Sequence, residues 1–178
     1  QKQNKSPNNL NRNLLDGYGA KRIVEYILNK KNYSLSNFEK KDLLSLYSLR
    51  KDFITQKYAL NQSDFSFNSH TSFFEKLTKS KIKLFIFHSK KNFIGQVRLE
   101  KSKKIFEIDY GINPLYRDRS LSYKMLKLVF KKIKNLKVDL VAKVRNNNLA
   151  SINVFKRLGF SIISQNKKLI FFRKNYAK

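Results

Sequence analysis

The sequence predicts an α/β (α+β) fold: a mixed, mainly antiparallel sheet of about six or seven strands with helices on both faces. Three apolar segments follow one another at residues 81–89, 93–100 and 105–112, and only short polar turns separate them. This spacing is typical of antiparallel hairpins. From residue 120 onward, helical and strand-like patterns alternate, which adds strands to a sheet while covering its faces. Together the two patterns favour a single mixed sheet.

The segments before the sheet are expected to supply one strand and two helices. A short strand begins at Tyr33, and apolar residues at helical spacing predict helices over 38–51 and 70–78. Residues 58–69 have neither period and are expected to be irregular. We interpret this two-helix region as the wall of a substrate cleft.

The second half of the chain has clearer periodicity. A helix is predicted over 120–134 because five apolar residues lie at helical spacing and lysines occupy the other side. These five are Leu121, Met125, Leu128, Val129 and Ile133. The remaining predicted elements are a strand at 138–144, a helix at 148–158, and a closing hairpin of residues 160–164 and 168–173.

Residues 1–32 are expected to form a lead-in that is separate from a domain at 33–178. The first 13 residues are polar and rich in Asn, as in a linker. A short amphipathic helix is predicted to follow, with an apolar stripe of Ile23, Val24, Ile27 and Leu28. Because the chain begins with Gln1 rather than Met, we expect it to be a fragment or a processed chain.

The composition excludes several classes of site. The 178 residues include no Cys, which excludes disulfides, thiolate nucleophiles and sulfur-based zinc sites. Two His are too few for most transition-metal centres, so no metal is expected. No run approaches the roughly 20 apolar residues that cross a bilayer, and the polar start lacks a signal core. We therefore expect a cytoplasmic protein that does not bind a membrane.

The net charge of +27, from 39 Lys and Arg against 12 Asp and Glu, attracts polyanions. One interpretation is compositional, because the chain is rich in Lys, Asn, Ile and Phe, as AT-rich codons produce, and its lysines are spread throughout. The other is a nucleic-acid-binding module. That module is disfavoured because the chain lacks a clustered basic helix and an interleaved aromatic platform.

The turn after the segment at 105–112 has the composition of an anion site. Pro114, Arg117 and Arg119 precede a helix that begins at about Ser120. The start of a helix presents free N–H groups and the positive end of its dipole, and arginines add donors. The turn therefore predicts phosphate binding, with an ordinary solvated helix start as the alternative.

This turn and a later segment together resemble the GNAT superfamily of acyl-CoA-dependent N-acyltransferases. Residues 117–122 read Arg-Asp-Arg-Ser-Leu-Ser where the family has Arg/Gln-x-x-Gly-x-Gly/Ala, so both glycine positions are Ser. Residues 148–160 match the family's pattern of Asn, a small residue and an aromatic that ends in Leu-Gly-Phe. The resemblance implies a GNAT-like fold and an N-acetyltransferase with acetyl-CoA as co-substrate.

The resemblance also implies which residues contact acetyl-CoA. They come from the end of the strand, the turn and the later helix: Ile112, Arg117, Arg119, Ser120, Leu121, Ser122, Asn148, Ser151 and Phe155. The family's frequent thiolate-protonating tyrosine falls at Phe155, which cannot donate a proton. Either Tyr110 or Tyr123 replaces it, or the thiolate leaves unassisted.

Glu107 is the candidate general base, because an amine must lose a proton when it attacks a thioester. It shares one strand face with Asp109 and lies where some family members place such a carboxylate. The alternative is a carboxylate that faces solvent or pairs with a lysine. His70 is a further candidate, as a base or as a ligand for a sugar hydroxyl, against an exposed histidine at a helix start.

Two further resemblances concern the acyl acceptor. The region from Tyr33, with Ser69-His70 and Phe73-Phe74, resembles acetyltransferases of UDP-linked 4-amino sugars in pseudaminic acid biosynthesis. Residues 14–22 resemble the C-terminal tail of the nucleotide-sugar hydrolase of that pathway, which implies an upstream fused hydrolase domain. Together they imply a nucleotide-linked amino sugar as acceptor. N-terminal or ribosomal-protein acetylation and a non-catalytic acyl-CoA sensor stay open as alternatives.

Overall fold

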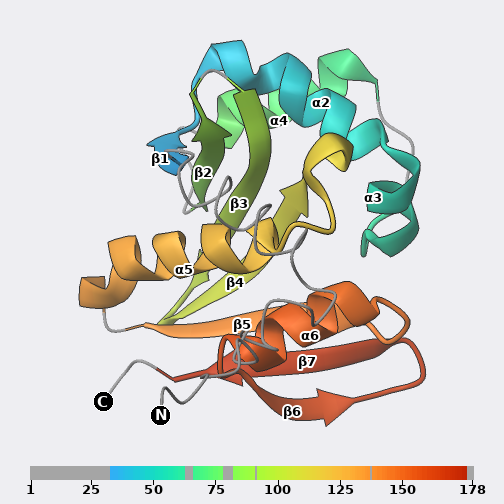
Figure 1. Ribbon diagram of the computed structural model, residues 1–178, viewed down its shortest axis with the longest axis vertical. Coiled ribbons are helices and arrows are strands. Elements are labelled where there is room, and N and C mark those ends of the chain that lie inside the picture. Colours follow the sequence, from blue (N-terminus) through green and yellow to red (C-terminus); the bar gives the residue numbers. More distant parts are fainter. Residues whose placement is uncertain (1–32, 63–65, 78–81, 91, 137, 176–178) are drawn as a thin grey trace, which may run out of the picture. The chain divides into compact units, whose positions relative to one another are not determined.

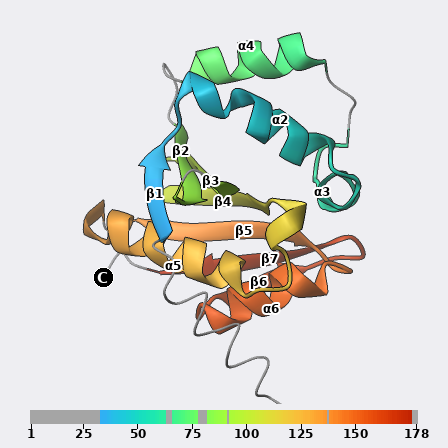
Figure 2. The same ribbon diagram turned by 45° about the horizontal axis from the view of Figure 1, so that its top comes forward.

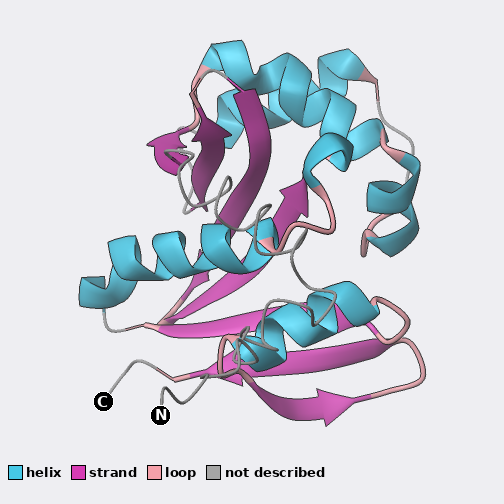
Figure 3. Cartoon of the chain, viewed as in Figure 1, coloured by secondary structure: helices cyan, strands magenta, loops and turns pink. Residues whose placement is uncertain are grey.

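A seven-stranded sheet organises the described part of the chain, which comprises residues 33–62, 66–77, 82–90, 92–136 and 138–175 of a computed structural model. The strand order is β1-β2-β3-β4-β5-β7-β6, and helices cover both faces (Figures 1 and 3). All neighbouring strands pair antiparallel except β4 and β5, which are parallel. The expected mixed, mainly antiparallel sheet is thereby confirmed. The strands are β1 (Tyr33–Asn37), β2 (Ile82–Ser89), β3 (Asn92–Ser102), β4 (Ile105–Ile112), β5 (Asp139–Arg145), β6 (Ser161–Gln165) and β7 (Leu169–Lys174).

The helices fall into two groups along the chain. Between β1 and β2 lie η2 (Lys40–Asp42), α2 (Leu43–Lys51), α3 (Phe53–Tyr58) and α4 (Phe67–Leu77). After β4 come η3 (Pro114–Tyr116), α5 (Leu121–Ile133), η4 (Lys134–Leu136) and, beyond β5, α6 (Leu149–Arg157). The predicted helices over 38–51, 120–134 and 148–158 therefore exist within a few residues of their expected ends.

The larger core lies between the sheet and helices α5 and α6. Helix α5 buries one stripe of apolar side chains, namely Leu121, Met125, Leu126, Val129, Phe130 and Ile133. Residues three and four apart lie on the same side of a helix, so this spacing forms a continuous apolar face. Phe106 and Ile108 of β4 and Ile152 and Phe155 of α6 belong to the same cluster.

A smaller cluster covers the opposite face of the sheet. Leu46 of α2 and Phe74 of α4 pack there against Leu84 and Ile86 of β2. Side chains of a strand alternate between the two faces of a sheet, so α2 and α4 lie on one face and α5 and α6 on the other. Figure 2 shows this separation, with α2 and α4 above the sheet in that view.

Strands β4 and β5 pair over only a short distance. Their register joins Ile105 with Asp139, Phe106 with Leu140, and Glu107 with Val141. Beyond Glu107 and Val141 the two strands separate, as Figure 1 shows. They form a V whose closed end is at Glu107 and whose open end, which we call the mouth, lies at Ile112 and Arg145.

Two local predictions differ from the structure. Helix α3 lies over residues 53–58, where no helix was predicted, and α4 begins at Phe67 rather than at His70. Helix α3 has only six residues and buries none of them, so it leaves no apolar stripe in the sequence. The predicted lead-in, with its resemblance to a hydrolase tail, lies outside the described residues. Within the described ranges, no helix is long and apolar enough to cross a membrane.

Candidate active site

The mouth of the V is bordered by the first turns of two helices. Strand β4 continues through η3 into α5, and β5 continues through a turn into α6, so both helices begin at the same end of the sheet. The first N–H groups of a helix lack partners within the helix and carry partial positive charge. The mouth is therefore suited to an anionic, hydrogen-bonding ligand that enters between the strands.

Tyr110 is the central side chain within the V. Its hydroxyl donates a hydrogen bond to Oγ of Ser151 on α6 at 2.9 Å, and it also bonds to the side chain of Ser122 on α5. Its ring meets that of Phe155 edge to face, with centroids 5.8 Å apart. Burial raises the pKa of the Tyr110 phenol above 10, although the serine hydrogen bonds oppose this shift. The structure thus brings together Tyr110, Ser122, Ser151 and Phe155, four of the predicted site residues.

Asn148 is the N-cap of α6. Its side-chain oxygen accepts a hydrogen bond from the Ser151 N–H at 3.1 Å, which satisfies one of the donors at the helix start. This cap fixes the orientation of the Asn148 amide beside the mouth. Asn148 and Ser151 therefore form a single polar unit at the start of α6.

The turn before α5 adopts an unusual backbone. Asp118 and Ser120 have φ angles of 58° and 54°, in the left-handed region that non-glycine residues rarely enter. Ser120 and Ser122 stand where the family pattern has glycine or alanine. Ser120 has the left-handed backbone, whereas Ser122 lies inside α5 with helical backbone. The turn therefore keeps the shape that glycine permits at position 120. It leads to the N-terminus of α5 at Leu121.

The predicted phosphate ligands are not equivalent. Arg119 is exposed, and its guanidinium lies 5.7 Å from the centroid of the Tyr116 ring. Arg117 instead turns toward α3, where it binds Asp52. Ile112 and Leu121 bury their side chains in the large core, so they offer the mouth only their backbone groups.

Glu107 lies at the closed end of the V, on the sheet face opposite α5 and α6. Its carboxylate accepts a hydrogen bond from Nζ of Lys143 on β5 at 2.8 Å, and both side chains are 39% exposed. The alternative that Glu107 pairs with a lysine therefore describes this structure. A role as base requires the carboxylate to exchange Lys143 for the acceptor amine.

Two other acids on the same face, one on β4 and one on β5, are paired in the same way. Asp109 lies 3.7 Å from the guanidinium of Arg98 on β3. Asp139 on β5 accepts a hydrogen bond from Arg173 on β7 at 2.5 Å. Each acidic side chain of β4 and β5 thus has a basic side chain from a neighbouring strand beside it.

His70 lies elsewhere, in the small cluster between α2 and α4. Its ring packs edge to face on Phe74, with centroids 4.6 Å apart, and on Tyr47 at 5.3 Å. It is only 8% exposed, so the expectation of an exposed helix-start histidine is wrong. Burial, together with the charge of Arg50, lowers the pKa of His70. The aromatic cluster, rather than the mouth, is its environment.

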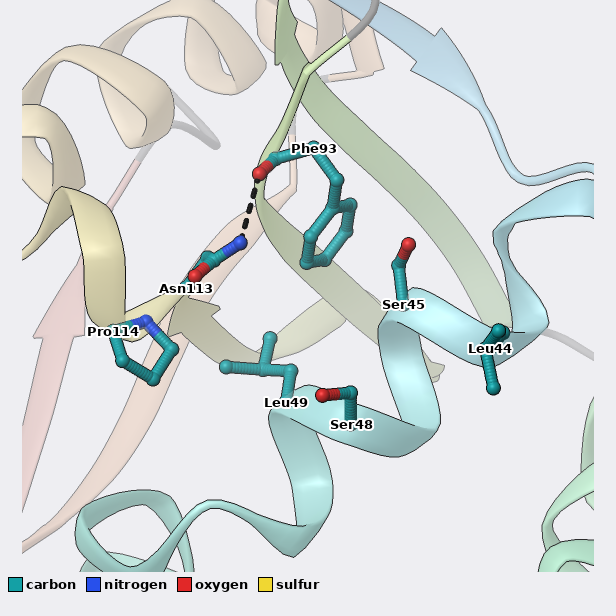
Figure 4. Close-up of a pocket in the computed structure, with 7 residues that line it drawn as sticks. All are labelled: Leu44, Ser45, Ser48, Leu49, Phe93, Asn113 and Pro114. Carbon is teal, nitrogen blue, oxygen red and sulfur yellow. Dashed lines mark hydrogen bonds between the residues drawn. The ribbon is translucent and has the colours of Figure 1, made fainter.

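A hollow of about 280 Å³ borders the site on the side of α2. Ser45, Ser48 and Leu49 of α2 form one wall, and Phe93 and the turn after β4 form the other (Figure 4). In that turn, the Asn113 amide donates a hydrogen bond to the Phe93 carbonyl at 3.1 Å. Uncharged side chains line this hollow, which distinguishes it from the ion-paired sheet face.

Several residues near the mouth were not predicted from the sequence. Asp52 caps α3 and binds Arg117, and Arg145 at the end of β5 binds the carbonyl of Ala59. The Asp-x-x-Thr pattern at residues 52–55 is a helix N-cap signal that identifies the start of α3. No local pattern identifies the partners of the two arginines. Among the described residues, no group of three or more His, Asp or Glu is placed to hold a metal ion.

Comparisons with known proteins agree with this geometry. The family model described as acetyltransferase (GNAT) domain matches residues 33–161. The sequence matches none of the curated proteins. Among solved structures, spermidine N-acetyltransferase from Vibrio cholerae, in complex with CoA and spermine, is similar at 16% identity and a TM-score of 0.74. That match covers 82% of this chain and 96% of the other.

Two further solved structures are similar. A domain from Methanocaldococcus jannaschii is 19% identical with a TM-score of 0.73, and the match covers 82% of this chain and 99% of that one. N-acetyltransferase PseH from Campylobacter jejuni, in complex with acetyl coenzyme A, is 18% identical with a TM-score of 0.62. That match covers 81% of this chain and 99% of PseH.

Proposed function

Because the chain belongs to the acetyltransferase (GNAT) domain family, we propose that it transfers acetyl from acetyl-CoA to the amino group of a nucleotide-linked amino sugar. The amine nitrogen attacks the thioester carbonyl, a C–N bond forms, and the C–S bond breaks. Coenzyme A leaves as a thiolate, and the proton of the amine passes to a base. The fold, the V and the family support acetyl transfer from acetyl-CoA. The charges of the protein support a nucleotide-linked acceptor.

The acetyl donor would bind through the mouth of the V. The N-terminus of α5 and Arg119 would hold its pyrophosphate, since both present donors and positive charge there. Asn148 and Ser151 at the start of α6 would face its pantetheine arm. Similar solved structures contain CoA or acetyl-CoA, which supports this assignment.

The ion pairs on the sheet face carry the choice of acceptor. A polyamine brings several positive charges and needs acids that are not already paired, whereas the acids of β4 and β5, namely Glu107, Asp109 and Asp139, each have a basic partner. The net charge of +27 also repels a polycation and attracts an anion. A diphosphate-linked amino sugar supplies that negative charge, and its one amino group carries far less positive charge than a polyamine. We therefore favour an anionic acceptor over a polyamine.

Two side chains are the candidates for the chemical step. Glu107, at the closed end of the V, would accept the amine proton once the acceptor displaces Lys143. Tyr110, inside the V, would donate a hydrogen bond to the departing thiolate once its hydroxyl exchanges Ser151 for the sulfur, in place of the absent hydroxyl at Phe155. His70 takes no part in this proposal, because it is buried among the rings of α2 and α4.

The proposal is tested by measuring thiol release from acetyl-CoA by the purified chain. The acceptors are a UDP-linked 4-amino sugar, the same amino sugar without UDP, spermidine, and a peptide with a free N-terminus. We expect turnover with the UDP-linked sugar and a higher KM for the free sugar, since the latter lacks the anion. Turnover with spermidine or the peptide, but not with either sugar, would refute the choice of acceptor.

A further inference from the structure

The first turn of helix α3 is bonded to Arg117, in the turn between β4 and α5. The Asp52 carboxylate accepts hydrogen bonds from the Thr55 N–H at 2.8 Å and the Thr55 hydroxyl at 3.0 Å, which caps the helix. The Arg117 guanidinium donates to the same carboxylate oxygen at 2.5 Å and to the Thr55 hydroxyl at 3.0 Å. Asp52 and Arg117 are 17% and 25% exposed, so this pair is largely shielded from water.

The other end of α3 is attached to strand β5. The Ala59 carbonyl, just after the last turn, accepts hydrogen bonds from Nε and Nη2 of Arg145 at 3.1 and 2.8 Å. Arg145 is the last residue of β5. One guanidinium thus uses two donors on one backbone oxygen, which fixes the end of α3 in direction as well as in distance.

The two attachments place α3 across the mouth. Arg117 follows β4 and Arg145 ends β5, so α3 joins the two strands where they lie apart. Leu140, Ala142 and Val144 of β5 belong to the core beneath α5 and α6. By strand alternation, Arg145 extends from the opposite face, which also carries Glu107 and Lys143. Figures 1 and 2 both show α3 beside the segment that follows β4.

We propose that α3 is a strap that forms the acceptor-side wall of the mouth, and that Asp52 and Arg145 are positioning residues for the acceptor. This inference rests on the proposed function for the identity of the acceptor alone. Because Arg117 is bound to Asp52, it belongs to the strap, and Arg119 and the N-terminus of α5 are the phosphate ligands. A change that releases Arg117 leaves acetyl-CoA affinity equal or higher, while the acceptor loses its wall.

The variants are chosen so that loss of an attachment can be distinguished from loss of the α3 N-cap and from damage to the acetyl-CoA site. Asp52→Ser keeps a good N-cap oxygen but removes the charge that binds Arg117. Arg145→Gln removes the guanidinium that donates twice to the Ala59 carbonyl, whereas Arg145→Lys keeps the positive charge and one donor group. Lys57→Gln, at an exposed position within α3, is the matched control. For each variant, KM for the acceptor, kcat, and Kd for acetyl-CoA are measured.

We expect Asp52→Ser and Arg145→Gln each to raise the acceptor KM about tenfold, which corresponds to about 1.4 kcal/mol, with kcat within about twofold. Arg145→Lys recovers part of this loss, and Lys57→Gln changes nothing. The Kd for acetyl-CoA is unchanged in Arg145→Gln and unchanged or lower in Asp52→Ser. An unchanged acceptor KM, or a raised Kd for acetyl-CoA in both variants, would overturn the inference.

Hydrogen exchange supplies a readout that needs no acceptor. Amides of residues 53–59 should exchange at least tenfold faster in Asp52→Ser and Arg145→Gln, while those of α5 stay as protected as in the parent protein. If exchange accelerates as expected and the Kd for acetyl-CoA does not rise, but no amino sugar is acetylated, the choice of acceptor is wrong and the strap stands. If the exchange of α3 is unaffected, the strap is wrong whatever the acceptor.

Discussion

The turn before α5 makes one prediction that separates two serines which the sequence pattern treats alike. Ser120 has a φ of 54° and makes no side-chain cap for α5, and it is exposed. A left-handed conformation costs a non-glycine residue about 1–2 kcal/mol. Glycine removes this cost but loses about 0.4–1 kcal/mol more backbone entropy on folding. Ser120→Gly should therefore stabilise the protein by about 0.5–1 kcal/mol.

Ser122→Gly is the matched control, because Ser122 lies inside α5 and bonds to Tyr110. Its removal costs helix propensity and one hydrogen bond, so we expect a loss of about 1 kcal/mol. Thermal unfolding measures both, with a shift of about 2–4 °C per kcal/mol for a chain of this size. The reasoning fails if the two variants shift the midpoint in the same direction. It also fails if Ser120→Gly lowers the affinity for acetyl-CoA, since glycine keeps the backbone shape.

Three further predictions concern single side chains. Glu107→Gln should lower kcat at neutral pH about a hundredfold or more. Glu100→Gln, at the residue directly opposite Glu107 in the β3–β4 register, should leave kcat unchanged. Equal rates for Glu107→Gln and the parent would exclude Glu107 as the general base. Tyr110→Phe should lower kcat about tenfold to a hundredfold, which is what one hydrogen bond to a charged group contributes. Adding Phe155→Tyr to the Tyr110→Phe variant should restore part of the lost kcat. An unchanged kcat in Tyr110→Phe would exclude a hydrogen bond from Tyr110 to the thiolate. The hydrogen bonds from Arg117 and Thr55 outweigh burial and lower the pKa of Asp52 below 3.8, so its contribution to stability is present above that pH and lost as the pH falls through the folded value. The free energy of unfolding of the parent minus that of Asp52→Ser should therefore shrink below about pH 4, and a difference that stays constant down to pH 2 contradicts this assignment.

The elements that position the site were predictable because their signals are local. The apolar run at 105–112 and the helical spacing at 120–134 depend on residues within a few positions of one another. They correspond closely to β4 and α5. The pairing of Asn148 with Ser151 is also local, since an N-cap and the residue three positions later are neighbours in any helix.

The parts that were missed depend on contacts between distant residues. Asp52 and Arg117 are 65 positions apart, and Ala59 and Arg145 are 86 apart, so no window of sequence relates them. The motif at 117–122 predicts that Arg117 contacts the coenzyme, and it carries no information about Asp52, which Arg117 binds in this structure. His70 was expected at the surface because its burial depends on rings of α2 and α4 that approach only in the fold.

The position of Tyr110 bears on how the thiolate can leave. Phe155 has no hydroxyl, but the Tyr110 ring lies against it and the Tyr110 hydroxyl reaches Ser151, one turn earlier on α6. A thiol has a pKa of about 8.5, and burial raises the pKa of this phenol above 10, so proton transfer from Tyr110 to the thiolate is unfavourable. In the proposed mechanism, Tyr110 would therefore act as a hydrogen-bond donor that stays protonated. On this argument, at pH values below the phenol pKa, kcat of the parent protein should not fall with rising pH in a way that Tyr110→Phe abolishes. The thiolate would be protonated by solvent after it leaves.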